Sequence, residues 1–198
     1  PVIAGLLLQV GWQWVYYLNA MLSGVLLSAF ACTSWPGERC HARLQFRQVK
    51  QLVRQGAFLL ALLSIFLVVG AEMGLTAWVV EFVRTRGAFA VGDVGAGLFL
   101  TYFALAMLVG RLFYGFAAER AGAPWALLVS ALGAAVSLVF FIMSGSLAGS
   151  IFAVVLYGLF LSGMVATLIA YACGRFPWAA GTISGLMTAA IGSGAAVF

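Results

Sequence analysis

The stretch GAFLLALLSIFLVVGAEMGLTAWVVEF, residues 56–82, decides the fold of this chain. Between Gly56 and Ala71 it contains no charged side chain. About 20 consecutive apolar residues are enough to cross the hydrocarbon core of a bilayer as a helix. The stretch therefore predicts a transmembrane helix with one ionisable group, Glu72, deep inside it. A carboxylate at that depth is costly, and such residues tend to be retained for a proton, an ion or a polar solute.

The composition of the whole chain supports a membrane protein. Hydrophobic residues make up 65% of 198 positions and charged residues 8%, and the mean hydropathy is +1.13. A soluble domain would carry roughly 25% charged residues. We therefore expect an all-α integral membrane protein. The net charge of +5 does not indicate nucleic-acid binding, because the topology derived below accounts for the placement of the basic residues.

Apolar runs long enough to span the membrane recur along the chain. We expect five spans at about 12–33, 56–82, 94–117, 124–144 and 148–172, with a sixth that starts near Pro177. Residues 1–9 look like the tail of a preceding span. Asp93 is placed to cap the 94–117 helix, and Pro124 and Pro177 fit the first turn of a helix. Because both ends of the chain fall in or beside apolar stretches, we expect a segment truncated at both ends.

The basic residues set the orientation in the membrane. If the hydrophilic segment 35–55 is cytoplasmic, then eight of the ten Lys and Arg residues lie on the cytoplasmic side and only Arg84 and Arg86 lie outside. The eight are Arg39, Arg43, Arg47, Lys50, Arg54, Arg111, Arg120 and Arg175. Basic residues favour the cytoplasmic face of membrane proteins. We therefore expect an inner-membrane protein, in the bacterial plasma membrane, with residues 35–55 in the cytoplasm.

Residues 35–55 also form the expected domain boundary, between membrane units at 1–34 and 56–198. The basic residues at 43, 47, 50 and 54 recur at helical spacing, and Ala42, Phe46, Val49 and Val53 form a second stripe beside them. This pattern fits a short amphipathic helix on the membrane surface. A solvated linker that obeys the positive-inside rule explains it equally well.

Glycine is patterned in two places. Gly70 and Gly74 form a GxxxG around Glu72, and Gly181, Gly185, Thr188 and Gly192 form a small-residue stripe on the last helix. Small residues let helix backbones approach closely in lipid, so both patterns predict helix packing.

Glu72 has no obvious partner in this sequence. At 1.5 Å per residue it lies about 24 Å along its helix from Gly56, whereas Arg111 lies about 9 Å from a helix end near Ala117. The two differ in depth by about 15 Å, so no static salt bridge is expected. Burial disfavours the charged carboxylate, which suits a proton carrier. Thr76, one turn away on the same face, is a further candidate for the solute or proton site. The structural alternatives for Glu72 are a hydrogen bond to the backbone or to Thr76, or a partner outside this segment.

Four aromatic residues are further candidates for a solute path. Trp78 is placed to stack on a sugar ring or to anchor the helix at the interface. Tyr157 and Tyr171 share one helical face with Met164, and this stripe either lines the path or packs the bundle interior. Tyr102 is a similar candidate.

Enzymatic motifs are absent from the sequence. No HExxH, GxSxG or phosphate-loop pattern occurs, and the adjacent Cys40 and His41 lack further ligands. We expect neither catalysis nor a metal or cofactor; a proton gradient would supply the energy.

The stretch Gly115-Phe-Ala-Ala-Glu119-Arg120-Ala-Gly122 resembles the signature loop of the major facilitator superfamily, glycine-x-x-x-acid-base-x-glycine. It departs from the family pattern at Ala123 and Pro124, where basic residues are usual. In that family the acid–base pair latches neighbouring helix ends, so the resemblance implies a cytoplasmic gate at Gly115, Glu119, Arg120 and Gly122, with Arg111 at the same mouth.

Two further stretches resemble the same family. Pro1-Val-Ile-Ala-Gly5 followed by Gly11-Trp12-Gln13-Trp14 is similar to the end of helix 5 and the start of helix 6, with Gln13 where arginine is common. Gly70-Ala71-Glu72-Met73-Gly74 followed by Trp78 resembles helix 7 of the fucose and glucose–proton symporter branch.

The resemblance covers essentially the whole chain and implies a bundle of the major facilitator type. This chain would hold helix 6 of the N-terminal half and helices 7–11 of the C-terminal half, with substrate bound between the halves near the midplane. The missing N-terminal half would be its main partner besides the bilayer and a small-molecule solute. Helices 7, 8, 10 and 11 would face the cavity, which favours Glu72, Tyr102, Tyr157 and Tyr171.

We therefore expect a secondary active transporter that works by alternating access and takes up a small polar solute, such as a sugar, with a proton. Glu72 would bind substrate hydroxyls or carry the proton. The alternatives are an efflux carrier for a drug or metabolite and a non-transporting membrane scaffold or sensor on the same fold.

Overall fold

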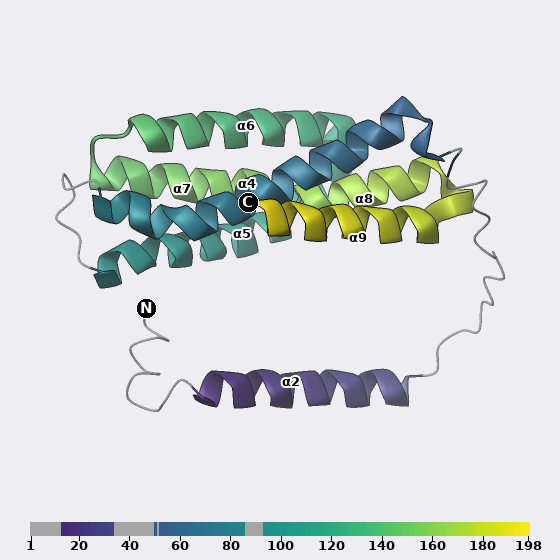
Figure 1. The fold of residues 1–198 in the computed structure, drawn as a ribbon, viewed down its shortest axis with the longest axis horizontal. Helices are drawn as coiled ribbons and strands as arrows, with labels where there is room; N and C mark the ends of the chain where they lie inside the picture. Colours follow the sequence, from purple (N-terminus) through teal and green to yellow (C-terminus); the bar gives the residue numbers. More distant parts are fainter. Residues whose placement is uncertain (1–12, 34–49, 51, 86–92) are drawn as a thin grey trace. The chain divides into compact units, whose positions relative to one another are not determined.

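The computed structural model describes residues 13–33, 50, 52–85 and 93–198 of the chain. The chain divides into two compact units, Pro1–Arg43 and Leu44–Phe198. All regular structure in the described ranges is helical, with no strand, which confirms the prediction of an all-α membrane fold (Figure 1).

The first unit contains one described helix, α2, Gln13–Cys32. Its 20 residues match the predicted span at 12–33, and Trp14 and Tyr17 make an edge-on ring contact with centroids 6.1 Å apart. The predicted tail of an earlier span, residues 1–9, lies outside the described residues.

The second unit is a bundle of helices that lie alongside one another (Figure 1). They are α4 Gly56–Thr85, α5 Asp93–Ala121, α6 Ala123–Met143, α7 Leu147–Leu161, α8 Met164–Arg175, the short 3₁₀ turn η2 Pro177–Ala179, and α9 Ala180–Val197. With α7–α8 and η2–α9 each taken as one segment, they provide five segments long and apolar enough to cross a membrane, as predicted for residues 56–198.

Two clusters of buried side chains hold this bundle together. One joins α4, α5, α6 and α7 around Phe99, Phe103 and Phe141, and the other joins α4, α8 and α9 around Ile65, Ile183 and others. The outer faces carry exposed Leu, Val and Phe side chains. In lipid those faces gain nothing from burial, so close packing of side chains decides how the helices associate.

The turn between α5 and α6 is shorter than predicted. α5 runs through Ala121, four residues past the predicted end, and Gly122 is the whole connection to α6. Gly122 has φ 82° and ψ 142°, a conformation open to glycine, and Pro124 occupies the first turn of α6. Gly115, Glu119 and Arg120 therefore lie within the last turns of a helix, because the alanines around them favour helix continuation.

The predicted span at 148–172 is interrupted. α7 ends at Leu161 and α8 begins at Met164, so Ser162 and Gly163 break the helix. The Ser162 hydroxyl donates a hydrogen bond to the Leu159 carbonyl at 2.7 Å. Gly163 packs directly against the ring of Tyr114 from α5, where a Cβ would collide with it. Pairs of Gly and Ser are a recognised cause of helix kinks.

Close helix packing occurs at a different glycine from those predicted on the last helix. A Cβ on Gly194 of α9 would lie 2.6 Å from the Phe66 carbonyl oxygen of α4, so the two backbones approach closely there. Gly70, on the predicted GxxxG, packs against the ring of Phe198. A Cβ on Gly181, Gly185 or Gly192 would meet no atom within 4 Å, so the predicted stripe makes no close contact with the described residues.

Most of the predicted amphipathic helix falls on residues 34–49 and 51, which lie outside the described residues. At its end, Lys50, Leu52 and Val53 are helical. Leu52 is 0% exposed and belongs to the α4–α8–α9 cluster, whereas Val53, from the predicted apolar stripe, is 39% exposed. Contacts with the bundle thus bury Leu52 and not Val53, the residue of the predicted apolar stripe.

Candidate functional site

Glu72 lies on α4 and is half-buried inside the span. Within the described part of the chain, its carboxylate makes no hydrogen bond and no ion pair. The acidic residue that does form an ion pair is Glu81, whose carboxylate lies 3.9 Å from Arg84 one turn further on, and both side chains are exposed. Glu72 is therefore an intramembrane acid without a direct partner among the residues described.

Thr76 does not satisfy the Glu72 carboxylate. Its hydroxyl donates to the Met73 carbonyl at 3.0 Å, a bond within the same turn of α4. The structural alternative in which Glu72 pairs with Thr76 is therefore absent from this structure.

Arg111 lies closer to the depth of Glu72 than the sequence predicted. Because α5 continues to Ala121, Arg111 lies ten residues, about 15 Å, from the end of its helix, and the depth offset from Glu72 falls to about 9 Å. No ion pair joins the two side chains in the described ranges, as expected.

Tyr157 of α7 is the second group linked to Glu72. It is 3% exposed, and its ring stacks on Phe103 of α5 with centroids 5.9 Å apart and an interplanar angle of 24°. Its buried hydroxyl has no hydrogen-bond partner among the described residues. Tyr157 and Ala71, next to Glu72, also line one cavity of about 250 Å³. An acid of α4 and a phenol of α7 thus lie close to the same cavity.

The other predicted aromatic residues do not join this cluster. Tyr171 is 46% exposed, whereas Tyr157 and Met164 are buried, and the break at Ser162 and Gly163 separates Tyr157 from the other two. Trp78 is 67% exposed and Tyr102 is half-buried. In the described part of the chain neither Trp78 nor Tyr102 makes a hydrogen bond with Glu72.

Two cavities lie between α5 and α8 and meet at Ala166 and Thr167. The first, of about 510 Å³, is lined by Arg111, Tyr114, Gly115, Ser162, Gly163 and others. The second, of about 430 Å³, is lined by Ala118, Glu119, Ala170 and Tyr171 among others. We call them together the α5–α8 groove. It places a cation near one end and an anion near the other, on walls of small residues.

The groove contains residues that the sequence did not predict as functional. Tyr114 and Ser162 line its first cavity, and Thr167 lines both. The Ser162-Gly163 pair is the signal that points to them, because a kink at that position opens space beside the facing helix.

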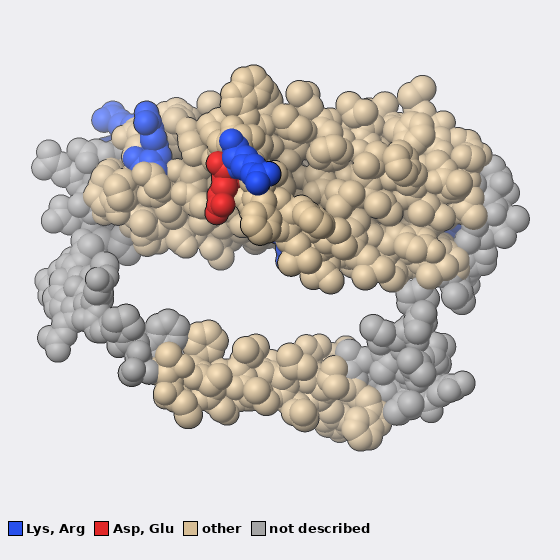
Figure 2. Space-filling model, turned by 180° about the vertical axis from the view of Figure 1, so that it is seen from behind, with Lys and Arg blue, Asp and Glu red and all other residues tan. Residues whose placement is uncertain are grey.

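Of the predicted gate residues, Arg111 and Gly115 line the first cavity of this groove, Glu119 lines the second, and Arg120 and Gly122 line neither. Gly115, Glu119 and Arg120 are exposed on α5, and no ion pair joins Glu119 to Arg120 in the described structure. Figure 2 shows that most of the visible face of the bundle is uncharged and that the charged side chains plainly seen there lie in one half of it. No cluster of three or more potential metal ligands occurs among the described residues.

The fold and this site together define an α-helical integral membrane protein. Its sequence matches the model of the Major Facilitator Superfamily over residues 1–198, so the chain belongs to that family. It is therefore a membrane transporter of the major facilitator type, which confirms the family predicted from the residue 115–122 motif. No curated protein matches the chain significantly.

Proposed function

We propose that this protein is a proton-coupled secondary transporter that takes up a small polar solute, a sugar or a molecule of similar polarity, by alternating access. The observation that carries the proposal is Glu72, an acid within a membrane span that lacks a direct partner among the described residues. Intramembrane carboxylates are rare and are associated with proton relays and solute paths.

Glu72 is proposed to carry the proton. Among the described residues no ion pair holds the Glu72 carboxylate, so none of them prevents the proton from returning. The Tyr157 hydroxyl, which has no hydrogen-bond partner among the described residues, is available to donate a hydrogen bond to a solute or to a water near Glu72. A static salt bridge would have kept the carboxylate charged, and none joins Glu72 to a described residue.

The α5–α8 groove is the proposed path at the cytoplasmic end. Arg111, Thr167 and Glu119 offer hydrogen-bond donors and acceptors along it. We place the gate at Glu119 and Arg120, where charges at the mouth change partners as the two halves of the transporter approach and separate.

The test uses the complete protein in proteoliposomes that contain a trapped pH-sensitive dye. A panel of monosaccharides and related polyols is added outside, and solute-driven proton entry is recorded for wild type and Glu72→Gln. We expect proton entry with one solute for wild type and none for the variant. Thr76→Val is the matched control, since it alters a polar group of the same helix one turn away that the structure bonds internally.

Three outcomes decide the proposal. Proton entry in the variant equal to that of wild type would contradict the role of Glu72. No response to any solute, with the protein shown to be folded, would favour efflux of an amphipathic molecule, for which the apolar cavity walls are suited. Normal cell physiology after disruption of both Glu72 and Arg120 would favour the scaffold alternative.

A further inference from the structure

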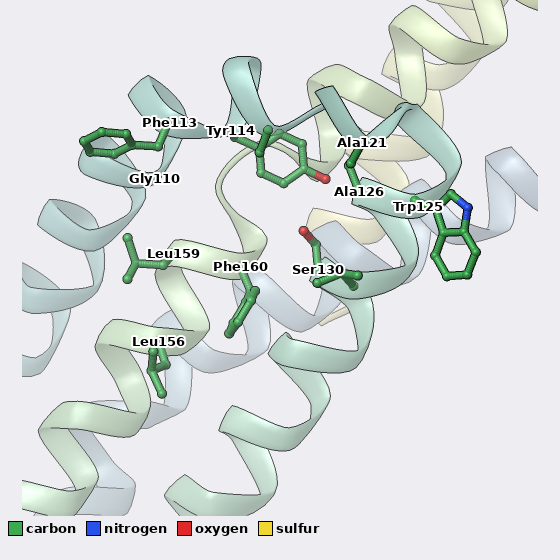
Figure 3. Close-up of a pocket in the computed structure, with 12 residues that line it drawn as sticks. Gly110, Phe113, Tyr114, Ala121, Trp125, Ala126, Ser130, Leu156, Leu159 and Phe160 are labelled. Carbon is green, nitrogen blue, oxygen red and sulfur yellow. The ribbon is translucent and has the colours of Figure 1, made fainter. Parts of the chain in front are cut away.

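A fourth cavity, separate from the α5–α8 groove except for Tyr114 in their shared wall, lies between α5, α6 and α7 and has a volume of about 390 Å³ (Figure 3). We call it the α5–α6–α7 cavity. Its size falls in the range of small-molecule sites, roughly 300–1,000 Å³. Most of its wall is apolar or aromatic. The lining includes Phe113, Trp125, Val129, Leu156, Leu159 and Phe160.

The cavity has a defined polar feature. The Tyr114 hydroxyl is buried and has no hydrogen-bond partner among the residues that the structure describes, and Ser130, also in the wall, is buried. Figure 3 shows both hydroxyls directed toward the same part of the cavity. A buried phenol without an acceptor is uncommon in native proteins and calls for an explanation. A ligand that brings a hydrogen-bond acceptor would provide one.

The wall is held in place by close packing. The ring of Tyr114 lies directly against Gly163, and the ring of Phe160 lies against Gly133 of α6, where a Cβ would be only 2.6 Å from it. Each ring that borders the cavity is therefore packed on one side against a glycine of a neighbouring segment.

The mouth of the cavity faces lipid. Trp125 and Val129 are exposed residues of α6, and the exposed face of that helix continues with Leu132, Val136 and Val139. α6 contains no charged residue along its 21 positions. A face of this kind on a membrane-spanning helix contacts acyl chains.

The position of the cavity along the bundle also suits a lipid. It begins beside the α5–α6 turn, at Ala121 and Trp125, and extends along α6 to Ser130. Tryptophan near a helix end is typical of the membrane interface. A molecule whose polar part lies at the interface and whose tail enters the hydrocarbon matches this direction.

We propose that the α5–α6–α7 cavity binds one acyl chain of a membrane glycerophospholipid, whose ester carbonyl accepts a hydrogen bond from the Tyr114 hydroxyl. Ester carbonyls accept but do not donate, which matches a phenol in need of an acceptor. Because Tyr114 also lines the α5–α8 groove, the bound lipid fixes one side chain of that groove. The assignment stands independently of which solute is transported.

The test is photochemical. The complete protein is reconstituted in nanodiscs with a phosphatidylcholine that carries a diazirine on its second acyl chain, irradiated and mapped by peptide mass spectrometry. We expect label on the inner wall, at Leu156, Leu159 or Phe160, as well as on exposed Leu132. Ala126→Phe, which fills the cavity, should abolish the inner-wall label and leave the Leu132 label. Val136→Phe, on the same exposed face but outside the cavity, should change neither.

A second pair of variants tests the hydrogen bond. Tyr114→Phe keeps the ring and should reduce inner-wall labelling roughly two- to tenfold, the effect expected for one neutral hydrogen bond. Tyr157→Phe removes another buried, unpartnered hydroxyl in a different cavity and should leave the labelling unchanged.

Several results would overturn the proposal. Label confined to the outer face of α6 would show that no lipid enters the cavity. Inner-wall label that persists unchanged in Ala126→Phe would place the lipid elsewhere. Inner-wall labelling by a diazirine-tagged alkylamine that excess phospholipid does not compete away, with no labelling by the phospholipid itself, would assign the cavity to a small amphiphile.

Discussion

Among the described residues, Gly122 has the backbone conformation that tolerates substitution least. Its φ of 82° and ψ of 142° lie in a region that costs other residues about 1–3 kcal/mol. The space around it is open, since a Cβ would meet no atom within 4 Å. Any cost of substitution there must therefore come from the backbone and not from crowding.

We predict that Gly122→Ala lowers the unfolding temperature of the detergent-solubilised protein by several degrees, because the backbone penalty is about 1–3 kcal/mol. The matched control is Gly115→Ala. Gly115 is helical, exposed and equally uncrowded, so alanine there should stabilise by roughly 0.5–1 kcal/mol. Equal shifts for the two variants would contradict the assignment of the turn to Gly122 alone.

The sequence motif at 115–122 predicted the family of the protein but not the local structure of the motif itself. The acid–base pair and both glycines indicated the family, and the family was confirmed. The same pattern suggested a loop, yet Gly122 alone makes the turn. The alanines between the glycines favour a helix, so α5 continues to Ala121. A spacing of motif residues does not determine where a helix ends.

The break between α7 and α8 is the main feature at the scale of the elements. The 148–172 stretch was apolar throughout, and hydropathy alone does not distinguish a straight span from a kinked one. The contact of Gly163 with Tyr114, a residue 49 positions earlier, decides the position of the break. Long-range packing of this kind leaves no periodic trace in the sequence, so Tyr114 and Thr167 were not predicted as site residues.

We predict that Gly163→Ala destabilises the protein by about 1–3 kcal/mol, the usual cost of overpacking, because the new methyl group would collide with the Tyr114 ring. Thermal unfolding in detergent measures the effect. Gly174→Ala, on α8 with open space around it, is the control and should be neutral or stabilising.

A double variant isolates the cause of that effect. In a Tyr114→Ala background the ring is gone, so Gly163→Ala should cost clearly less than it does alone. Additive effects of the two substitutions would show that the contact is not what limits residue 163.

The α5–α8 groove connects the elements to the behaviour of the whole transporter. Opposite charges line its two cavities, with Arg111 in the first cavity and Glu119 in the second. Alternating access requires that this end open and close, and the proposed gate would act through the charges there. Neither Glu119 nor Arg120 is bound in an ion pair within the described ranges, so both are available to partners elsewhere in the protein.

We predict that Arg120→Ala shifts the balance between inward-open and outward-open states. A cysteine placed at Thr167, in a background without native cysteines, reports the change through its rate of reaction with a membrane-impermeant maleimide. We expect a faster reaction from the cytoplasmic side, because the gate has lost a charge. Arg84→Ala, which removes a charge from the last turn of α4, is the control. Identical rates for wild type, Arg120→Ala and Arg84→Ala would argue against a gate at Arg120.

Solute exchange and proton-driven accumulation, measured in the same proteoliposomes for wild type and Glu72→Gln, test the central claim most directly. Exchange of labelled for unlabelled solute requires binding and alternating access but no net proton movement, whereas accumulation requires both. If Glu72 carries the proton, the variant retains exchange and loses accumulation at every pH. Accumulation that persists in Glu72→Gln with the pH dependence of wild type would contradict the account.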